Sequence, residues 1–166
     1  MASRVVSEHQ FDQPIIRKKS VSVRNDASMT STVDTGEFGT FILDEPTAHG
    51  GGGMGPSPLQ GVLGCLCGCE AVTFNRTAAD FNFVYDGLEF EAAFTIDIRG
   101  RMGMRGVVPH FRLIKVQALV TTDESEARLR EIVEETEARC PVFNLVKDAN
   151  VRVEMIWIRR ACSKVA

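Results

Sequence analysis

Residues 57–74, SPLQGVLGCLCGCEAVTF, decide the fold because they read as the beginning of a long helix. Ser57 can cap the helix, Pro58 suits its first position, and Gln60 can complete a capping box. Apolar residues then recur at three- and four-residue spacing, which places them on one helix face: Leu59, Val62, Leu63, Leu66, Cys69 and Val72. We expect the helix to end at Asp80 or Phe83, with Cys69 directed toward packed apolar surface.

The residues before this helix predict a small antiparallel sheet. Val21 and Val23 alternate with polar residues, turns fall near residues 25–26 and 34–36, and another strand follows over residues 38–43. Short strands with one apolar face cannot bury that face alone, so the sheet must lie on helices or on a partner chain. In the glycine-rich loop 46–56 the backbone is expected either to move or to approach another group closely.

The residues after the helix predict strands at 88–98, 111–120 and 151–158, with a long turn at 99–109. Asp123 and Glu126 form a capping box for a second amphipathic helix through Ala138, whose apolar face continues to Cys140. This order of elements indicates an α+β sandwich. Residues 1–14 are expected to form an N-terminal arm, and residues 15–166 a single domain.

Composition narrows the class of protein. The 166 residues are 44% hydrophobic and 25% charged, which is ordinary for a globular protein and predicts no membrane partner. The net charge of −3 and the absence of a dense basic block beyond residues 17–19 argue against a nucleic-acid partner. The first residues lack the apolar run of a secretory signal, so a cytoplasmic location is expected. Five cysteines in that compartment indicate thiols rather than structural bridges.

Two of these cysteines stand out by their position. Cys69 lies in the middle of the long helix, and Cys140 ends the second helix directly before Pro141. Either thiol could be a buried filler of the core, because cysteine is among the most often buried residues. A metal site formed by the CxCxC run with His49 or His110 is disfavoured, since CxCxC on a helix spreads its thiols around the cylinder. We expect neither a metal nor another cofactor.

The sequence resembles the family of osmotically inducible protein C (OsmC) and the organic hydroperoxide resistance (Ohr) proteins. Three features carry the resemblance: residues 55–74 with Cys69, the segment EARCPVF with Cys140 before Pro141, and Arg24 in the first strand region. The SPLQ form of the helix start resembles the OsmC-like branch of the family.

This resemblance implies an intertwined homodimer, with antiparallel sheets wrapped around central long helices. It also implies a thiol peroxidase in which Cys69 is the peroxidatic thiol, Cys140 the resolving thiol, and Arg24 the residue that holds the thiolate and orients the peroxide. The implied substrates are organic hydroperoxides, and the implied reductant is a cellular dithiol. The chemistry is physically reasonable, because a guanidinium favours a thiolate and a second thiol converts a sulfenic acid to a disulfide before further oxidation.

One departure separates this chain from the peroxidases of the family. In those enzymes a glutamate follows the proline of the helix start and pairs with the arginine, whereas here that position is Leu59. Glu45 and Glu70 are possible substitutes for the missing acid. The alternative function is a non-enzymatic OsmC-like dimer that binds a small apolar ligand at the subunit interface, with inert thiols.

Overall fold

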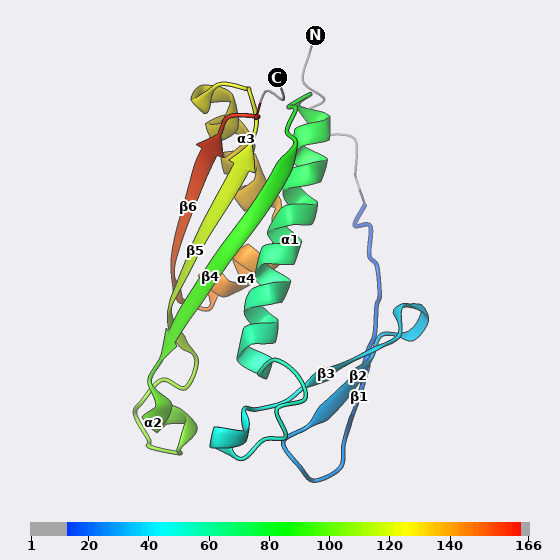
Figure 1. The fold of residues 1–166 in the computed structure, drawn as a ribbon, viewed down its shortest axis with the longest axis vertical. Coiled ribbons are helices and arrows are strands. Elements are labelled where there is room, and N and C mark those ends of the chain that lie inside the picture. The colour runs from blue at the N-terminus through cyan, green and yellow to red at the C-terminus, as the bar shows by residue number, and fades with distance from the viewer. Residues whose placement is uncertain (1–12, 164–166) are drawn as a thin grey trace. The chain divides into compact units, whose positions relative to one another are not determined.

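The protein is described by a computed structural model that covers residues 13–163, and these divide into two compact units, 13–64 and 65–163. Each unit contains one three-stranded sheet, and the helices complete the expected α+β fold (Figure 1). Nearly all of the expected N-terminal arm, residues 1–12, lies outside the described residues. The single domain over residues 15–166 stays a prediction.

The first unit contains an antiparallel meander of β1 (Ser22–Asn25), β2 (Ser31–Asp34) and β3 (Thr40–Leu43). The expected small sheet and its turns are therefore confirmed. The last of these strands begins later than expected because Gly36–Phe38 form a turn of 3-10 helix. Arg24 lies in β1, opposite Thr32 of β2, and is exposed.

The glycine-rich loop closes around a buried carboxylate. Asp44 is fully buried and accepts hydrogen bonds from the backbone amides of Glu45 (2.7 Å), Gly52 (3.1 Å) and Met54 (3.0 Å). A Cβ atom on Gly51 would lie 1.8 Å from the Glu45 carbonyl oxygen, so only glycine fits there. Of the two expected alternatives for this loop, the structure shows close backbone approach.

Helix α1 (Pro58–Asp80) begins with the expected capping box. The Ser57 amide donates to Oε1 of Gln60 at 2.9 Å, and the Gln60 amide donates to Oγ of Ser57 at 3.3 Å. The buried face agrees with the expected one in part, because Leu63 and Leu66 are buried but Val62 and Val72 are exposed. The residues that are buried follow the neighbouring stripe of the helix: Leu63, Leu66, Glu70, Phe74, Thr77 and Ala78.

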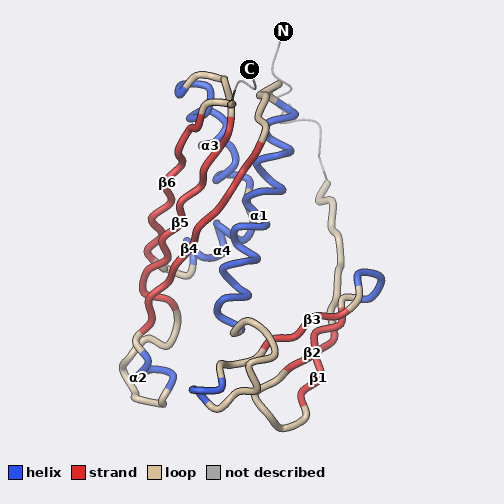
Figure 2. The backbone as a smooth tube through the Cα atoms, in the orientation of Figure 1, coloured by secondary structure: helices blue, strands red, loops and turns tan. Residues whose placement is uncertain are grey.

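The second unit contains the sheet of β4 (Gly87–Ile96), β5 (Phe111–Thr121) and β6 (Arg152–Arg160), with β5 in the centre (Figure 2). β4 and β5 are antiparallel, but β5 and β6 are parallel, so the expectation of antiparallel sheets was wrong for β6. A parallel pair requires a crossover connection, and two helices between β5 and β6 supply it. β4 ends before Ile98 because Asp97 caps the short helix α2 (Ile98–Arg101).

One face of this sheet packs against helices α1 and α3 (Glu126–Arg139). The Phe74 ring of α1 stacks on Trp157 of β6, with ring centroids 5.3 Å apart. The buried core around this pair comes from α1, the segment after it, β5 and α3: Phe74, Ala78, Phe83, Val120, Leu129 and Ile132. The part of α1 that directly follows Cys69 and Glu70 thus packs against the sheet.

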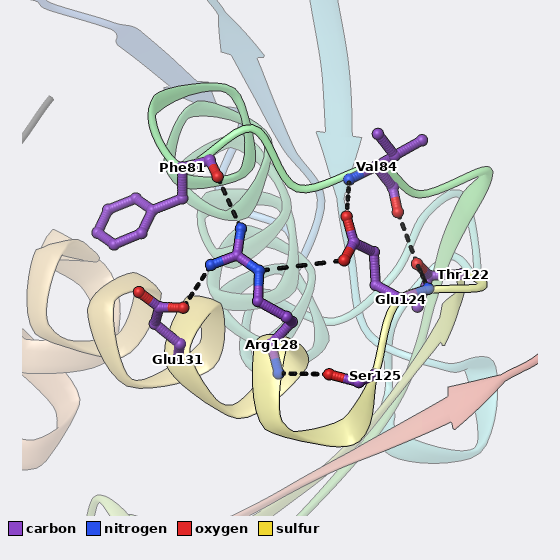
Figure 3. Close-up of polar contacts among 7 residues, drawn as sticks. All are labelled: Phe81, Val84, Thr122, Glu124, Ser125, Arg128 and Glu131. Carbon is purple, nitrogen blue, oxygen red and sulfur yellow. Dashed lines mark hydrogen bonds and ion pairs between the residues drawn. The ribbon is translucent and has the colours of Figure 1, made fainter. Parts of the chain in front are cut away.

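The beginning of α3 is built by polar contacts shown in Figure 3. Oγ of Ser125 accepts from the Arg128 amide at 3.2 Å, so the helix cap is Ser125 and the expected cap at Asp123 was wrong. The Arg128 guanidinium donates to the Phe81 carbonyl at 2.7 Å and pairs with Glu131 at 2.5 Å. These contacts connect α3 to the end of α1.

Helix α4 (Pro141–Asp148) was not expected from the sequence. The sequence pattern treats Pro141 as the end of a helix, but proline also suits the first position of a new one. Cys140 has extended backbone angles and stands between the two helices, as the last cap of α3 and the first cap of α4. Within residues 13–163, no helix is long and apolar enough to cross a membrane.

Candidate active site

Cys140 is fixed by the junction between α3 and α4. Its amide donates to the Thr136 carbonyl at 2.9 Å, and its carbonyl accepts from the amide and the side chain of Asn144 at 3.1 and 2.8 Å. The residue is fully buried. The backbone of Cys140 is therefore held on both sides, where α3 ends and α4 begins.

Cys69 lies on α1 and is partly exposed, while its carbonyl accepts a hydrogen bond from Oγ1 of Thr73 at 2.8 Å. The Cys69 side chain interacts with the thiol of Cys140, although the two residues belong to different helices. Both are free thiols. The structure thus brings together the two cysteines singled out in the sequence, one partly exposed and one buried.

Glu70 is the third member of this cluster. It is fully buried, and neither carboxylate oxygen has a well-formed hydrogen bond to any described residue. Burial raises its pKa to about 7; the nearby thiol of Cys140 opposes this rise, and the charge of Glu137 adds to it. A carboxyl group with such a pKa can both accept and donate a proton at neutral pH.

The sequence offered no specific signal for Glu70 beyond its possible role as a substitute acid. A usable signal was nevertheless present, because Leu66, Glu70 and Phe74 follow one another at four-residue spacing. A single acidic residue in the middle of an apolar helix stripe is costly unless it has a function or a partner.

The thiol of Cys140 is protonated at neutral pH. Burial is the main cause that raises its pKa to about 12, and the neighbouring Glu70 and Cys69 act in the same direction. The backbone amide of Phe143, in the first turn of α4, opposes this rise. Cys140 can therefore attack another sulfur only when a neighbouring group takes its proton.

Glu137 lies beside this cluster but has a partner of its own. Its Oε1 accepts from Nε1 of Trp157 at 3.0 Å, and burial raises its pKa. The same indole ring stacks on Phe74 of α1. The carboxylate of Glu137 is thus held in place by the core, whereas that of Glu70 is not.

The other cysteines have different surroundings. Cys65 is exposed, one helical turn before Cys69. The pKa of Cys67 is raised by partial burial and by the charge of Glu70. The pKa of Cys162 is raised to about 11, first by a hydrogen bond with Asp86. Across residues 13–163, no cluster of three or more side chains suited to a metal ion is present.

Arg24 and Leu59, the other positions that the resemblance singled out, belong to the first unit. Arg24 lies on the exposed edge strand β1, and Leu59 lies in the first turn of α1. Because the thiols belong to the second unit, a role of Arg24 toward Cys69 stays a proposal.

The structure is an α+β fold in which Cys69 of a long helix lies near the buried Cys140. The chain belongs to the OsmC-like protein family, whose family model matches residues 50–155. A search of curated proteins found no match.

Solved structures with the same fold include an OsmC-like protein from Mycoplasma pneumoniae, with 17% identity and a TM-score of 0.74 over 90% of this chain and 100% of that one. An organic hydroperoxide resistance protein from Legionella pneumophila has 15% identity and a TM-score of 0.65, covering 87% of this chain and 99% of that one. The organic hydroperoxide resistance protein OhrB of Bacillus subtilis has 21% identity and a TM-score of 0.59, covering 85% and 98%. At these identities the likeness establishes the fold.

Proposed function

We propose that this protein is a thiol-dependent peroxidase that reduces organic hydroperoxides. The observation that carries the proposal is the placement of the two thiols: the partly exposed Cys69 is near enough to the buried Cys140 to help raise its pKa. Membership of the OsmC-like family supports it, as does the likeness to proteins described as organic hydroperoxide resistance proteins.

In the first step the thiolate of Cys69 attacks the outer oxygen of the hydroperoxide. The O–O bond breaks, the sulfur gains a hydroxyl group and becomes a sulfenic acid, and the alkoxide takes a proton to leave as an alcohol. Arg24 is proposed to stabilise the thiolate and orient the peroxide. Leu59 leaves this arginine without the acidic partner found in the well-characterised peroxidases, so its guanidinium is held less firmly.

In the second step the sulfur of Cys140 attacks that of Cys69 and displaces the hydroxyl group, which leaves as water. The product is a disulfide between these two residues, and an external dithiol returns both to thiols. Because Cys140 is buried, it meets the sulfenic acid of its own site in preference to other proteins.

We further propose that the protein works as a homodimer in the cytoplasm. Val62 and Val72 of α1 are exposed, and a Cβ on Gly64 or Gly68 would meet no described atom within 4 Å. Apolar side chains and open glycines on a helix provide a surface on which a second copy can pack closely.

Turnover of cumene hydroperoxide with dithiothreitol as reductant tests the proposed activity. Cys69→Ser should lower kcat/KM by about a thousandfold, because the hydroxyl group that replaces the thiol is not a nucleophile toward peroxides. Cys65→Ser, one helical turn away, serves as the matched control and should keep its activity. Normal turnover by Cys69→Ser would refute the proposal and favour the ligand-binding function.

A further inference from the structure

We propose that Glu70 is a catalytic residue that accepts the proton of Cys140 while this thiol attacks Cys69, and then returns the proton to the leaving group. This inference rests on the proposed function, since it assigns the proton transfer of the second step. The group that the thiol needs is present in the same buried cluster.

The position of Glu70 is the first support. A fully buried carboxyl group is costly without hydrogen-bond donors, and no amide or hydroxyl of the described residues donates to Glu70. The polar side chain that acts on it is the thiol of Cys140, at the junction of α3 and α4. Glu137, the other acidic group nearby, is held by the indole of Trp157 and influences Glu70 only through its charge.

The proton balance of the step is complete with these groups. The carboxylate of Glu70 takes the proton from Cys140, whose sulfur then forms the S–S bond with Cys69 as the S–O bond of the sulfenic acid breaks. The departing hydroxide takes the proton back from Glu70 and leaves as water. Glu70 ends the step as it began, so a single buried carboxyl group serves every cycle.

The protonation states agree with this assignment. The pKa of Glu70, raised to about 7, leaves a substantial carboxylate fraction at neutral pH, whereas the pKa of Cys140, raised to about 12, leaves almost no thiolate. The titratable groups that act on this pair are Cys67 and Cys69 of α1 and Glu137 of α3. The backbone amide of Phe143 favours the thiolate once it forms.

The attack by Cys140 can be measured without a peroxide. In a background with Cys65, Cys67 and Cys162 changed to serine, Ellman's reagent converts the accessible Cys69 to a mixed disulfide with thionitrobenzoate. Cys140 then displaces the coloured thiolate, and the absorbance gives the rate of its attack. This assay reports on Glu70 even if the protein fails to reduce any hydroperoxide.

Glu70→Gln should slow the release by about a hundredfold near neutral pH, the effect of losing a general base. In the triple-serine background that retains Glu70, the rate of release should rise with pH and level off above the pKa of Glu70. The Glu70→Gln variant should lose this plateau. Glu137→Gln should retain the plateau and shift it to lower pH, because one negative charge near Glu70 is removed. Thr77→Val replaces the other unpartnered buried side chain of α1 and serves as the neutral control.

A different rate of release is expected if Glu70 does not accept the proton of Cys140. If Glu70 only repelled the thiolate, Glu70→Gln would make Cys140 more acidic and release would be faster. Equal or faster release of thionitrobenzoate by this variant would overturn the proposal. So would a pH profile without a plateau near neutrality in the triple-serine background that retains Glu70. Failure of the protein to consume cumene hydroperoxide would overturn the proposed peroxidase function and leave the result of the release assay standing.

Discussion

Cys140→Ala should turn the protein into a peroxidase that inactivates itself within about one turnover per site. Without the resolving thiol, the sulfenic acid at Cys69 persists and a second hydroperoxide oxidises it to the sulfinic acid, which dithiols do not reduce. Mass spectrometry of the tryptic peptide should show two added oxygen atoms on Cys69. Steady-state activity should be lost while the first oxidation proceeds at its usual rate.

The matched control for this experiment is Cys162→Ala, because that thiol lies beside Asp86 and Asp123 and away from the proposed chemistry. This variant should retain steady-state activity. Cys140→Ala removes one buried sulfur atom and should cost only about 1 kcal/mol of stability, so the fold should survive. Sustained turnover by Cys140→Ala would mean that another thiol, of the protein or of the added dithiol, reduces the sulfenic acid of Cys69 before a second hydroperoxide reaches it.

Stability should fall as the pH rises from about 5 to about 8, and Glu70 should be a main cause. Its folded pKa of about 7 is above the ordinary value of 4.5, so the folded protein binds the proton more tightly than the unfolded chain. The stabilisation is fully present below the unfolded pKa and is lost as the pH rises through the folded one. The shift corresponds to on the order of 2–3 kcal/mol across this range.

Urea unfolding at several pH values, compared between the native protein and Glu70→Gln, measures this effect. The glutamine cannot ionise, so the difference in the free energy of unfolding between the two proteins should change with pH by that amount. The variant should be relatively more stable at the alkaline end, where the native chain carries a buried charge. A difference that does not vary with pH would show that Glu70 titrates as an ordinary carboxyl group.

Some features that neighbouring residues determine agree with the prediction from sequence. The beginning of α1 is an example, because the capping box of Ser57 and Gln60 involves only neighbouring residues. The strands β4 and β5 also follow from their alternation of apolar and polar residues. The resemblance singled out both Cys69 and Cys140, and the structure brings them together.

The features that depend on distant contacts were not predicted. Asp123 and Glu126 satisfy the pattern of a capping box, but the Asp123 side chain accepts from the amide of Cys162, and Ser125 caps α3 instead. The sequence pattern predicts the end of a helix at Pro141, although this residue also begins α4. The parallel pairing of β6 follows from how these helices cross the sheet. Neither capping patterns nor periodicity contain that information.

The buried face of α1 shows the same limit at the site itself. Leu63 and Val62 are both apolar and adjacent in sequence, yet only Leu63 is buried. Glu70 lies between Leu66 and Phe74 on the helix stripe that is buried. It is therefore buried as well, beside Cys140. Its part in the site follows from this choice of face, which spacing alone left undecided.

The most direct test of the account is disulfide mapping after the reduced protein has been treated with one equivalent of cumene hydroperoxide. Free thiols are blocked, the protein is digested without reductant, and the linked peptides are identified by mass spectrometry. The account predicts one dominant disulfide, between Cys69 and Cys140, with Cys65 still reduced. A dominant disulfide between other cysteines, or a protein whose thiols all remain reduced while the hydroperoxide persists, would contradict it.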